Sequence, residues 1–299
     1  MGSEMCIRDR DDSVYVMRVE RRDGVSQLTL AHITPTGTEE LAVLEVASAP
    51  PHVPDVADFR LLADGGSSVN HMPAICVIGS GGDIVLMPVD EEASAPAEVV
   101  GSVDQGILAA AWSPEEDVLV LITGGEKRLI VMTREFEVMS ETMLSTEAFG
   151  DDQPVNVGWG SKSTQFHGSE GKQAAMAAAN APEESDPRGP LVPEDDGLPR
   201  ISWRGDGAFF VTSSAEASHD TVHRILRTYT RTGTLSATSD RSVRGISHVL
   251  ACRPTGNLIA TTQRMGGPWA PGRHGRHDVV FFERNGLRHG EFSLREEHG

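Results

Sequence analysis

Short apolar runs alternate with turns rich in Pro, Gly and Asp along most of this chain. Alternation with a period of two residues, bounded by turn residues, predicts β-strands joined in hairpins. Four strands joined in that order form one blade of a β-propeller. The clearest such unit has Ser-Pro, Gly-Gly and Arg-Glu turns between its strands, which are 107–112, 118–123, 128–133 and 138–143.

One strand–turn–strand pattern recurs, with Trp112, Trp203 and Cys252 at equivalent positions before the turn. The intervals are 203 − 112 = 91 and 252 − 203 = 49 residues. Because the longer interval holds a low-complexity insertion, a repeat of about 40–50 residues is consistent with propeller blades. A single unit cannot bury its own apolar face and needs neighbours. We predict an all-β, WD-repeat-like β-propeller of about five blades, with Trp112 and Trp203 in blade cores and the first blade incomplete.

Other hairpins follow the same chemistry. An Asp-Gly turn joins the runs 14–19 and 27–33, and a third short strand covers 41–46. Gly79–Gly82 joins two apolar runs, and Asn285-Gly286 predicts a two-residue turn near the end of the chain. The other predicted strands are 155–160, 222–229, 234–238 and 278–283.

Three segments depart from the repeat. Residues 1–10 match neither the repeat nor the character of the rest, so we interpret them as an artefactual leader and assign 11–299 to the propeller. Residues 172–199 are rich in Ala, Glu, Pro and Asp, which predicts a flexible insertion, with a short helix over 173–179. The stretch 266–276 predicts a Gly/Pro/His/Arg-rich loop.

Charge and composition narrow the possible environments. The chain carries 26 Lys and Arg against 44 Asp and Glu, a net charge of −18, which opposes non-specific attraction to nucleic acid or an anionic membrane. Its three cysteines lie far apart without metal-ligand spacing, which favours a reducing intracellular compartment. No apolar run is long enough to cross a bilayer, and the first ten residues contain no secretory signal.

Candidate catalytic and metal-binding patterns are weak. Gly168–Lys172 has only two residues between its glycines and lacks the Ser or Thr of a phosphate loop. The pairs His219/His223 and His274/His277 lie in strand ends or loops with no cysteine nearby, so surface positions explain them better than a metal site. We assign no catalytic, cofactor-binding or metal-ligating residue. Solvated acidic turns explain the adjacent carboxylates better than acid–base catalysis, at Glu115-Glu116, Asp151-Asp152 and Asp195-Asp196.

Several ordered motifs carry a resemblance to a known family. The most specific is QPVNVGWGSKSTQFHGSEGK at 153–172, and the others are at 107–136, 203–207 and 278–290. In these motifs the chain resembles the first β-propeller of the Elongator complex subunit 1 family, also called IKAP. The resemblance spans about 64–294 and does not extend to the insertion after Lys172 or the loop 266–276.

The resemblance implies a non-catalytic scaffold of the Elongator complex, which modifies carbon 5 of the wobble uridine in certain tRNAs. Chemistry in that family belongs to a radical-SAM partner subunit, and a WD-repeat second subunit is another partner. It also implies that tRNA is reached only through the assembled complex or through regions absent here, that no membrane is involved, and that the location is cytoplasmic, with the nucleus as a second site. The alternative is a generic WD-repeat-like interaction propeller in an unrelated assembly; an enzymatic propeller ranks third.

The resemblance implies that the propeller of this family has seven blades. About five predicted blades therefore indicate an incomplete seven-bladed ring. Missing blades would leave sheet faces uncovered and favour association of the isolated fragment.

Overall fold

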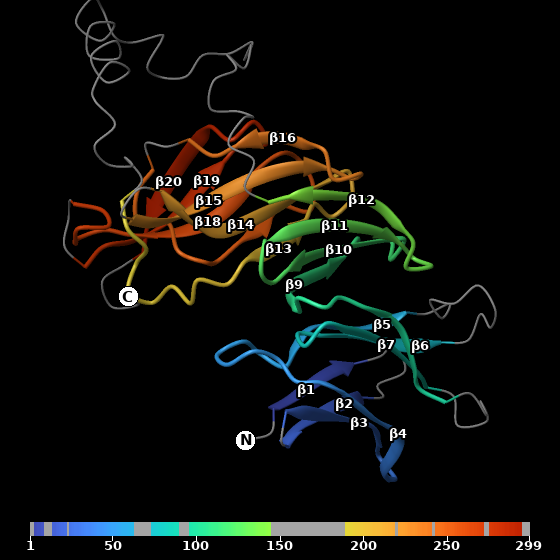
Figure 1. Cartoon of the computed structure of the whole chain (residues 1–299). Helices are drawn as coiled ribbons and strands as arrows, with labels where there is room; N and C mark the ends of the chain where they lie inside the picture. Colours follow the sequence, from blue (N-terminus) through green and yellow to red (C-terminus); the bar gives the residue numbers. More distant parts are fainter. Residues whose placement is uncertain are drawn as a thin grey trace, which may run out of the picture. The chain divides into compact units, whose positions relative to one another are not determined.

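The computed structural model describes residues 3–8, 14–22, 24–62, 73–89, 96–144, 189–218, 221–240, 243–271 and 275–294 (Figure 1). Within these ranges all regular secondary structure is β-strand, arranged as five antiparallel sheets of four strands each. Every neighbouring pair within a sheet is consecutive in sequence, which is the up-and-down order of propeller blades. The prediction of an all-β, blade-forming chain is confirmed. The helix predicted over 173–179 and the strand predicted over 155–160 lie outside the described residues.

The chain divides into two compact units, and each is described by itself. Unit 1 comprises Met1–Ser145 with Arg231–Gly233, and unit 2 comprises Thr146–Thr230 with Thr234–Gly299. The strands of unit 1 form three sheets: β1 (Ser3–Arg8), β2 (Val14–Arg22), β3 (Val25–Thr34) and β4 (Gly37–Ala47); β5 (Val56–Leu62), β6 (Ala74–Gly79), β7 (Asp83–Pro88) and β8 (Glu98–Ser102); β9 (Ile107–Trp112), β10 (Val118–Thr123), β11 (Arg128–Thr133) and β12 (Val138–Met143).

The strand β6, an inner strand of the middle sheet of unit 1, is apolar along its whole length. Side chains alternate between the two faces of a strand, and both faces of β6 are buried. Ile75 and Val77 join a core with the β2–β3 hairpin, whereas Cys76 and Ile78 join a second core with β9 and β10. A strand packed on both faces must be apolar at every position, so the run AICVIG at β6 follows from stacking of neighbouring sheets.

Unit 2 contains two sheets. Its core lies between them and includes Phe209, Leu226, Val280 and Phe282, each at most 3% exposed. The strands are β13 (Arg200–Trp203), β14 (Phe209–Ser218), β15 (Thr221–Thr230) and β16 (Leu235–Thr238); β17 (Ala251–Cys252), β18 (Ile259–Arg264), β19 (His277–Phe282) and β20 (Arg288–Ser293).

Two expectations about the N-terminal region are corrected. Setting residues 1–10 outside the fold was wrong for Ser3–Arg8, because β1 pairs with β2 from Ser3↔Val19 to Arg8↔Val14. The first sheet consequently has four strands rather than an incomplete set. The open edge of β2 presents unpaired backbone N–H and C=O groups, which an adjacent extended segment satisfies whatever its side chains.

The C-terminal hairpin turn is also longer than predicted. The two-residue turn at Asn285-Gly286 is wrong, since β19 ends at Phe282 and β20 begins at Arg288. The Gly286 N–H donates to the Glu283 carbonyl at 2.9 Å, and Gly286 has a φ of 82°. A register shift between Phe281 and Phe282 accompanies this longer turn, in which the left-handed residue is the glycine. In contrast, Arg22 pairs with Val25, so the predicted two-residue Asp-Gly turn is confirmed.

The two tryptophans predicted in blade cores differ in how deeply they are buried. Trp112 is 3% exposed and belongs to the second core of unit 1, as predicted. Trp203 is only half-buried, which corrects that prediction. Its ring packs against Phe210 with the ring centroids 4.9 Å apart, at the end of the short strand β13.

Candidate functional site

The largest concentration of buried charge lies where the segment 189–199 meets β15. The flexible insertion predicted over 172–199 is wrong for its described part, 189–199, because this segment packs on the sheet of unit 2. Val192 is 3% exposed, and the Leu191 N–H donates to the Val222 carbonyl at 2.8 Å. The composition of the segment is polar and does not by itself predict packing. A buried ion pair attaches the segment to the sheet.

That ion pair joins Asp195 to Arg224, and both side chains are fully buried. Arg224 Nε donates to Asp195 Oδ2 at 2.7 Å while Nη2 donates to Oδ1, so the pair is bidentate. The remaining guanidinium hydrogens reach the Leu198 carbonyl at 3.2 Å and the Ser213 hydroxyl at 3.2 Å. Every strong donor of Arg224 therefore faces an acceptor, which is the condition under which a buried charge pair is tolerated.

Asp196, the next residue, is 39% exposed and pairs with Arg200. Partial burial would raise the pKa of Asp196, but hydrogen bonds from Arg200 and from the Leu198 N–H, with the charges of Arg200 and His248, lower it below the ordinary value. Interpreting Asp195-Asp196 as a solvated acidic turn was correct for the exposure of Asp196 and wrong for Asp195, whose carboxylate is buried.

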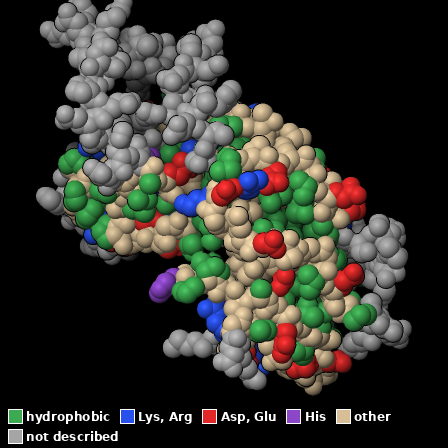
Figure 2. All heavy atoms as spheres, viewed as in Figure 1, with side chains coloured by type: hydrophobic (Ala, Val, Ile, Leu, Met, Phe, Trp, Pro, Cys, Tyr) green, Lys and Arg blue, Asp and Glu red, His purple; other side chains and the backbone are tan. Residues whose placement is uncertain are grey.

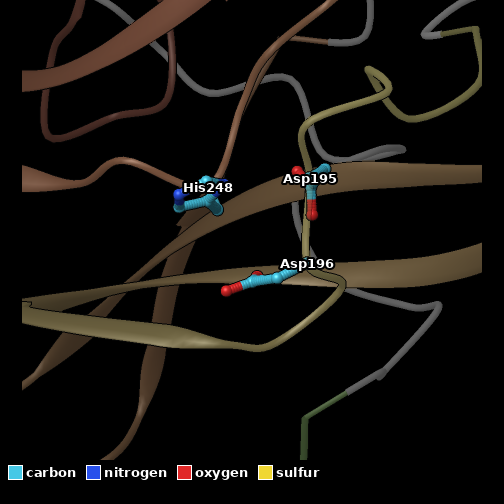
Figure 3. Close-up of side chains that lie close together, drawn as sticks. All are labelled: Asp195, Asp196 and His248. Atoms are coloured by element: carbon cyan, nitrogen blue, oxygen red, sulfur yellow. The ribbon is translucent and has the colours of Figure 1, made fainter. Parts of the chain in front are cut away.

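Asp195, Asp196 and His248 come together from two segments, the stretch before β13 and the loop before β17 (Figure 3). One ligand atom from each lies within 4.8 Å of the others, and carboxylate and imidazole are common metal ligands. However, both oxygens of Asp195 already accept from Arg224, and Asp196 accepts from Arg200. An entering cation would meet two guanidinium charges, which opposes metal binding by this group. The Asp195–Arg224 pair acts as a structural clamp between the segment 189–199 and β15.

Only one member of each histidine pair weighed in the sequence lies within the described residues. His223 is 2% exposed on β15, opposite Glu216 of β14, and His277 is half-buried at the start of β19. Their predicted partners, His219 and His274, lie outside the described residues, as do Gly168–Lys172 and Asp151-Asp152.

The two carboxylates of the acidic turn Glu115-Glu116 differ in exposure and in their contacts. The Glu115 side chain is 72% exposed, in agreement with a solvated turn. Glu116 is 23% exposed and accepts from Arg60 Nε at 3.2 Å. It therefore fastens the turn before β10 to β5, a structural contact.

Two neighbouring polar groups of a different kind lie in unit 1, the half-buried Asp58 on β5 and the buried Cys76 on β6. Burial raises the pKa of Asp58 to about 6, while the Phe59 N–H, which donates to it at 3.0 Å, and the Arg60 charge offset part of that rise. Burial and the neighbouring Asp58 carboxylate also raise the pKa of the Cys76 thiol. Cys76 is fully buried and protonated at neutral pH, so it is not a nucleophile.

Asp58 predicts a specific pH dependence of stability. Because its folded-state pKa of about 6 exceeds the ordinary value of 3.8, its contribution favours folding below pH 3.8 and is lost as the pH rises through 6. We expect this carboxyl to lower the free energy of unfolding by about 2 kcal/mol across that window, after discounting for its partial exposure. Urea unfolding at a series of pH values measures it.

Asp58→Asn should remove this decline, so that the variant gains stability relative to the parent chain as pH rises from 4 to 6. Asp196→Asn is the control, since the pKa of Asp196 is lowered and its removal should leave the decline in place. Equal pH profiles for Asp58→Asn and the parent would contradict the assignment.

Among the described residues, no helix is both long and apolar enough to cross a membrane.

Comparison with known proteins gives one family match that covers nearly the whole chain. A family model described as the ELP1 first N-terminal beta-propeller matches residues 3–299. Elongator complex protein 1 of Oryctolagus cuniculus is 40% identical over 221 residues, which cover 74% of this chain and 15% of that protein. The protein of the same name from Schizosaccharomyces pombe is 38% identical over 224 residues, covering 74% of this chain and 17% of that protein.

Among solved structures, Chaetomium thermophilum Sqt1 superimposes with a TM-score of 0.47 at 14% identity, covering 100% of this chain and 70% of that one. A likeness at this level carries no argument about function. The chain spans only 15–17% of the length of the two curated relatives described above.

Proposed function

We propose that this chain, which belongs to the family of first N-terminal β-propellers of Elongator subunit 1, is a non-catalytic scaffold part of the Elongator complex. Residues 3–299, which include β1, would form part of that propeller. The observation that carries the proposal is the family match across residues 3–299, together with five sheets of blade topology in the described residues. Stacked sheets of this kind expose turns and short strand edges that can contact other proteins.

The buried carboxylates of unit 2 form ion pairs with arginines, which supports a structural role. Asp195 is bound by Arg224. Glu216, whose side chain is 13% exposed, is bound by Arg227, whose side chain is 5% exposed. A carboxylate acting as a general base must instead reach the proton it removes. These two buried carboxylates are engaged by guanidinium groups, so they stabilise the sheet β13–β16.

The proposed partners are the other Elongator subunits, including the radical-SAM catalytic subunit and the WD-repeat second subunit. Modification of tRNA wobble uridine at carbon 5 would then be performed by the catalytic partner, with tRNA bound through the assembled complex. The net charge of −18 supports this division, because it disfavours direct phosphate binding by the chain as a whole. We propose a cytoplasmic location, with the nucleus as a second site.

Affinity purification with quantitative mass spectrometry tests the proposal. The tagged full-length protein that carries this propeller serves as bait in its own cells, and an unrelated WD-repeat propeller with the same tag is the control. We expect the remaining Elongator subunits to be enriched with the first bait and absent with the second. Enrichment of another assembly without Elongator subunits would instead support the generic interaction propeller.

A further inference from the structure

Three turns of unit 2 each carry an arginine, and together we name Arg204, Arg253 and Arg284 the arginine cluster. Arg204 follows β13 and Arg253 follows β17, at equivalent positions of the two sheets. Arg284 lies in the turn between β19 and β20. In antiparallel sheets of this order the turn after the first strand and the turn after the third lie at the same end. The topology therefore gathers the three arginines at one end of the two sheets.

Contacts bring these turns together. The Cys252 N–H donates to the Ser202 hydroxyl at 2.9 Å, joining the strands that precede the first two turns. A Cβ built on Gly205 would lie only 2.7 Å from the Pro254 carbonyl oxygen, so the two turn backbones touch. Any side chain at position 205 would separate them.

The buried ring of Phe209 holds two members of the cluster. The Arg204 guanidinium carbon lies 5.6 Å from the ring centroid, and that of Arg284 lies 5.1 Å from it. Both distances are within the range of cation–π attraction. Because Phe209 is 1% exposed, it is a fixed anchor, and the two guanidinium groups are positioned before any partner arrives.

The cluster differs from the other arginines of unit 2 in its pairing. Within the part of the chain that the structure describes, Arg253 and Arg284 are exposed and have no ion pair, and Arg204 pairs with the exposed Asp206 at 3.2 Å. Carboxylates of the same unit bind most of the other arginines, namely Arg200, Arg224, Arg227, Arg264, Arg276 and Arg288. The cluster thus keeps positive charge available on an acidic protein.

We propose that the arginine cluster is a docking site for an acidic peptide segment of a partner protein. A guanidinium group presents a planar fork of N–H donors that matches a carboxylate in two hydrogen bonds. Two such forks anchored on one ring, with a third on the adjoining turn, fit closely spaced Asp or Glu side chains. This inference is independent of the proposed Elongator role.

Charge favours a short peptide over a nucleic acid. Asp206 and Glu283 lie in the same turns as the arginines, so the local positive excess is small. Acidic side chains are also spread over the molecular face seen in Figure 2, in keeping with the net charge of −18. A long polyanion would meet this repulsion along its length, whereas a few carboxylates would meet only the cluster.

Fluorescence anisotropy with the whole chain tests the site at an ionic strength of about 0.05 M, where charge contacts are weakly screened. The probes are a labelled oligoglutamate peptide and a labelled oligouridine RNA of equal charge. We expect the peptide to bind more tightly than the RNA. Arg253→Gln, which leaves the Phe209 contacts intact, should weaken peptide binding about fivefold to tenfold, as loss of one charged hydrogen-bond partner predicts.

The matched control is Arg244→Gln, because Arg244 is an exposed arginine of unit 2 at the opposite end of its sheet, beside Gln263. It should leave peptide affinity unchanged. Arg284→Lys keeps the charge but loses the fork and should weaken binding in part. Thermal unfolding verifies that each variant remains folded.

Four results would overturn the proposal: no peptide binding by the parent chain, equal loss in Arg253→Gln and Arg244→Gln, undiminished binding in Arg253→Gln, or preference for the RNA. The last result would assign the cluster to nucleic-acid phosphates instead.

Discussion

Asp195→Asn is expected to destabilise unit 2 by about 3–5 kcal/mol, the usual effect of removing one partner from a buried ion pair. The variant would leave the Arg224 guanidinium fully buried and facing an amide in place of a carboxylate. It would also weaken the hydrogen bond that the Gly197 N–H donates to Asp195 Oδ1 at 2.8 Å, so the segment 189–199 should detach first. Urea unfolding followed by tryptophan fluorescence measures the change.

The neighbouring carboxylate provides a matched control for that experiment. Asp196→Asn removes an equal charge one residue away, but its pair with Arg200 is partly exposed and should contribute about 1 kcal/mol or less. The double variant Asp195→Asn with Arg224→Leu should recover part of the lost stability, because no cation remains buried. If Asp195→Asn and Asp196→Asn unfold at the same urea concentration, the ion pair is not a buried clamp.

Phe282→Ala should cost about 3–5 kcal/mol, as expected for truncating a fully buried aromatic side chain. Phe282 is 1% exposed and packs with Phe209 and Val280 in the core between the two sheets of unit 2. Its loss opens a cavity that β-sheets on both sides cannot close without breaking strand pairing. The measurement is the shift of the unfolding midpoint in guanidinium chloride.

Phe292→Ala on the adjacent strand β20 serves as the control. Phe292 is 50% exposed, and its main contact is the ring of Phe281, with centroids 5.9 Å apart. Such an aromatic pair contributes about 1 kcal/mol, so the control should lose far less stability than Phe282→Ala. If the two variants lose similar amounts of stability, Phe282 does not occupy a buried core position.

Much of the sheet structure was predictable from the sequence. The four strands predicted over 107–143 coincide with β9 to β12, because apolar runs and Gly, Pro and Asp turns mark both ends of each strand. Three strands were missed: β1, because residues 1–10 were set outside the fold, and β5 and β8. The pattern in Val56–Leu62 is not a clean alternation, and Glu98–Ser102 is a short, mostly exposed edge strand with few apolar side chains to mark it.

The site was less predictable than the fold. Asp195-Asp196 looks like an acidic turn, since nothing in the local sequence distinguishes one carboxylate from the other. Arg224 lies 29 residues further along the chain, on a buried strand that mixes apolar residues with His223 and Arg227. The one available signal was an arginine inside the buried-strand pattern of β15, because a charge at such a position requires a partner.

The sequence by itself determined the strand pattern, the blade-like repeat and the family, because period-two alternation and turn chemistry are local properties and the family motifs are contiguous. The tertiary structure alone decided which polar residues are buried. Burial of Asp195 and the gathering of Arg204, Arg253 and Arg284 depend on which sheet edge or turn each residue reaches after folding. That information is carried by long-range packing, since the same local sequence would remain solvated in the absence of the opposing strand.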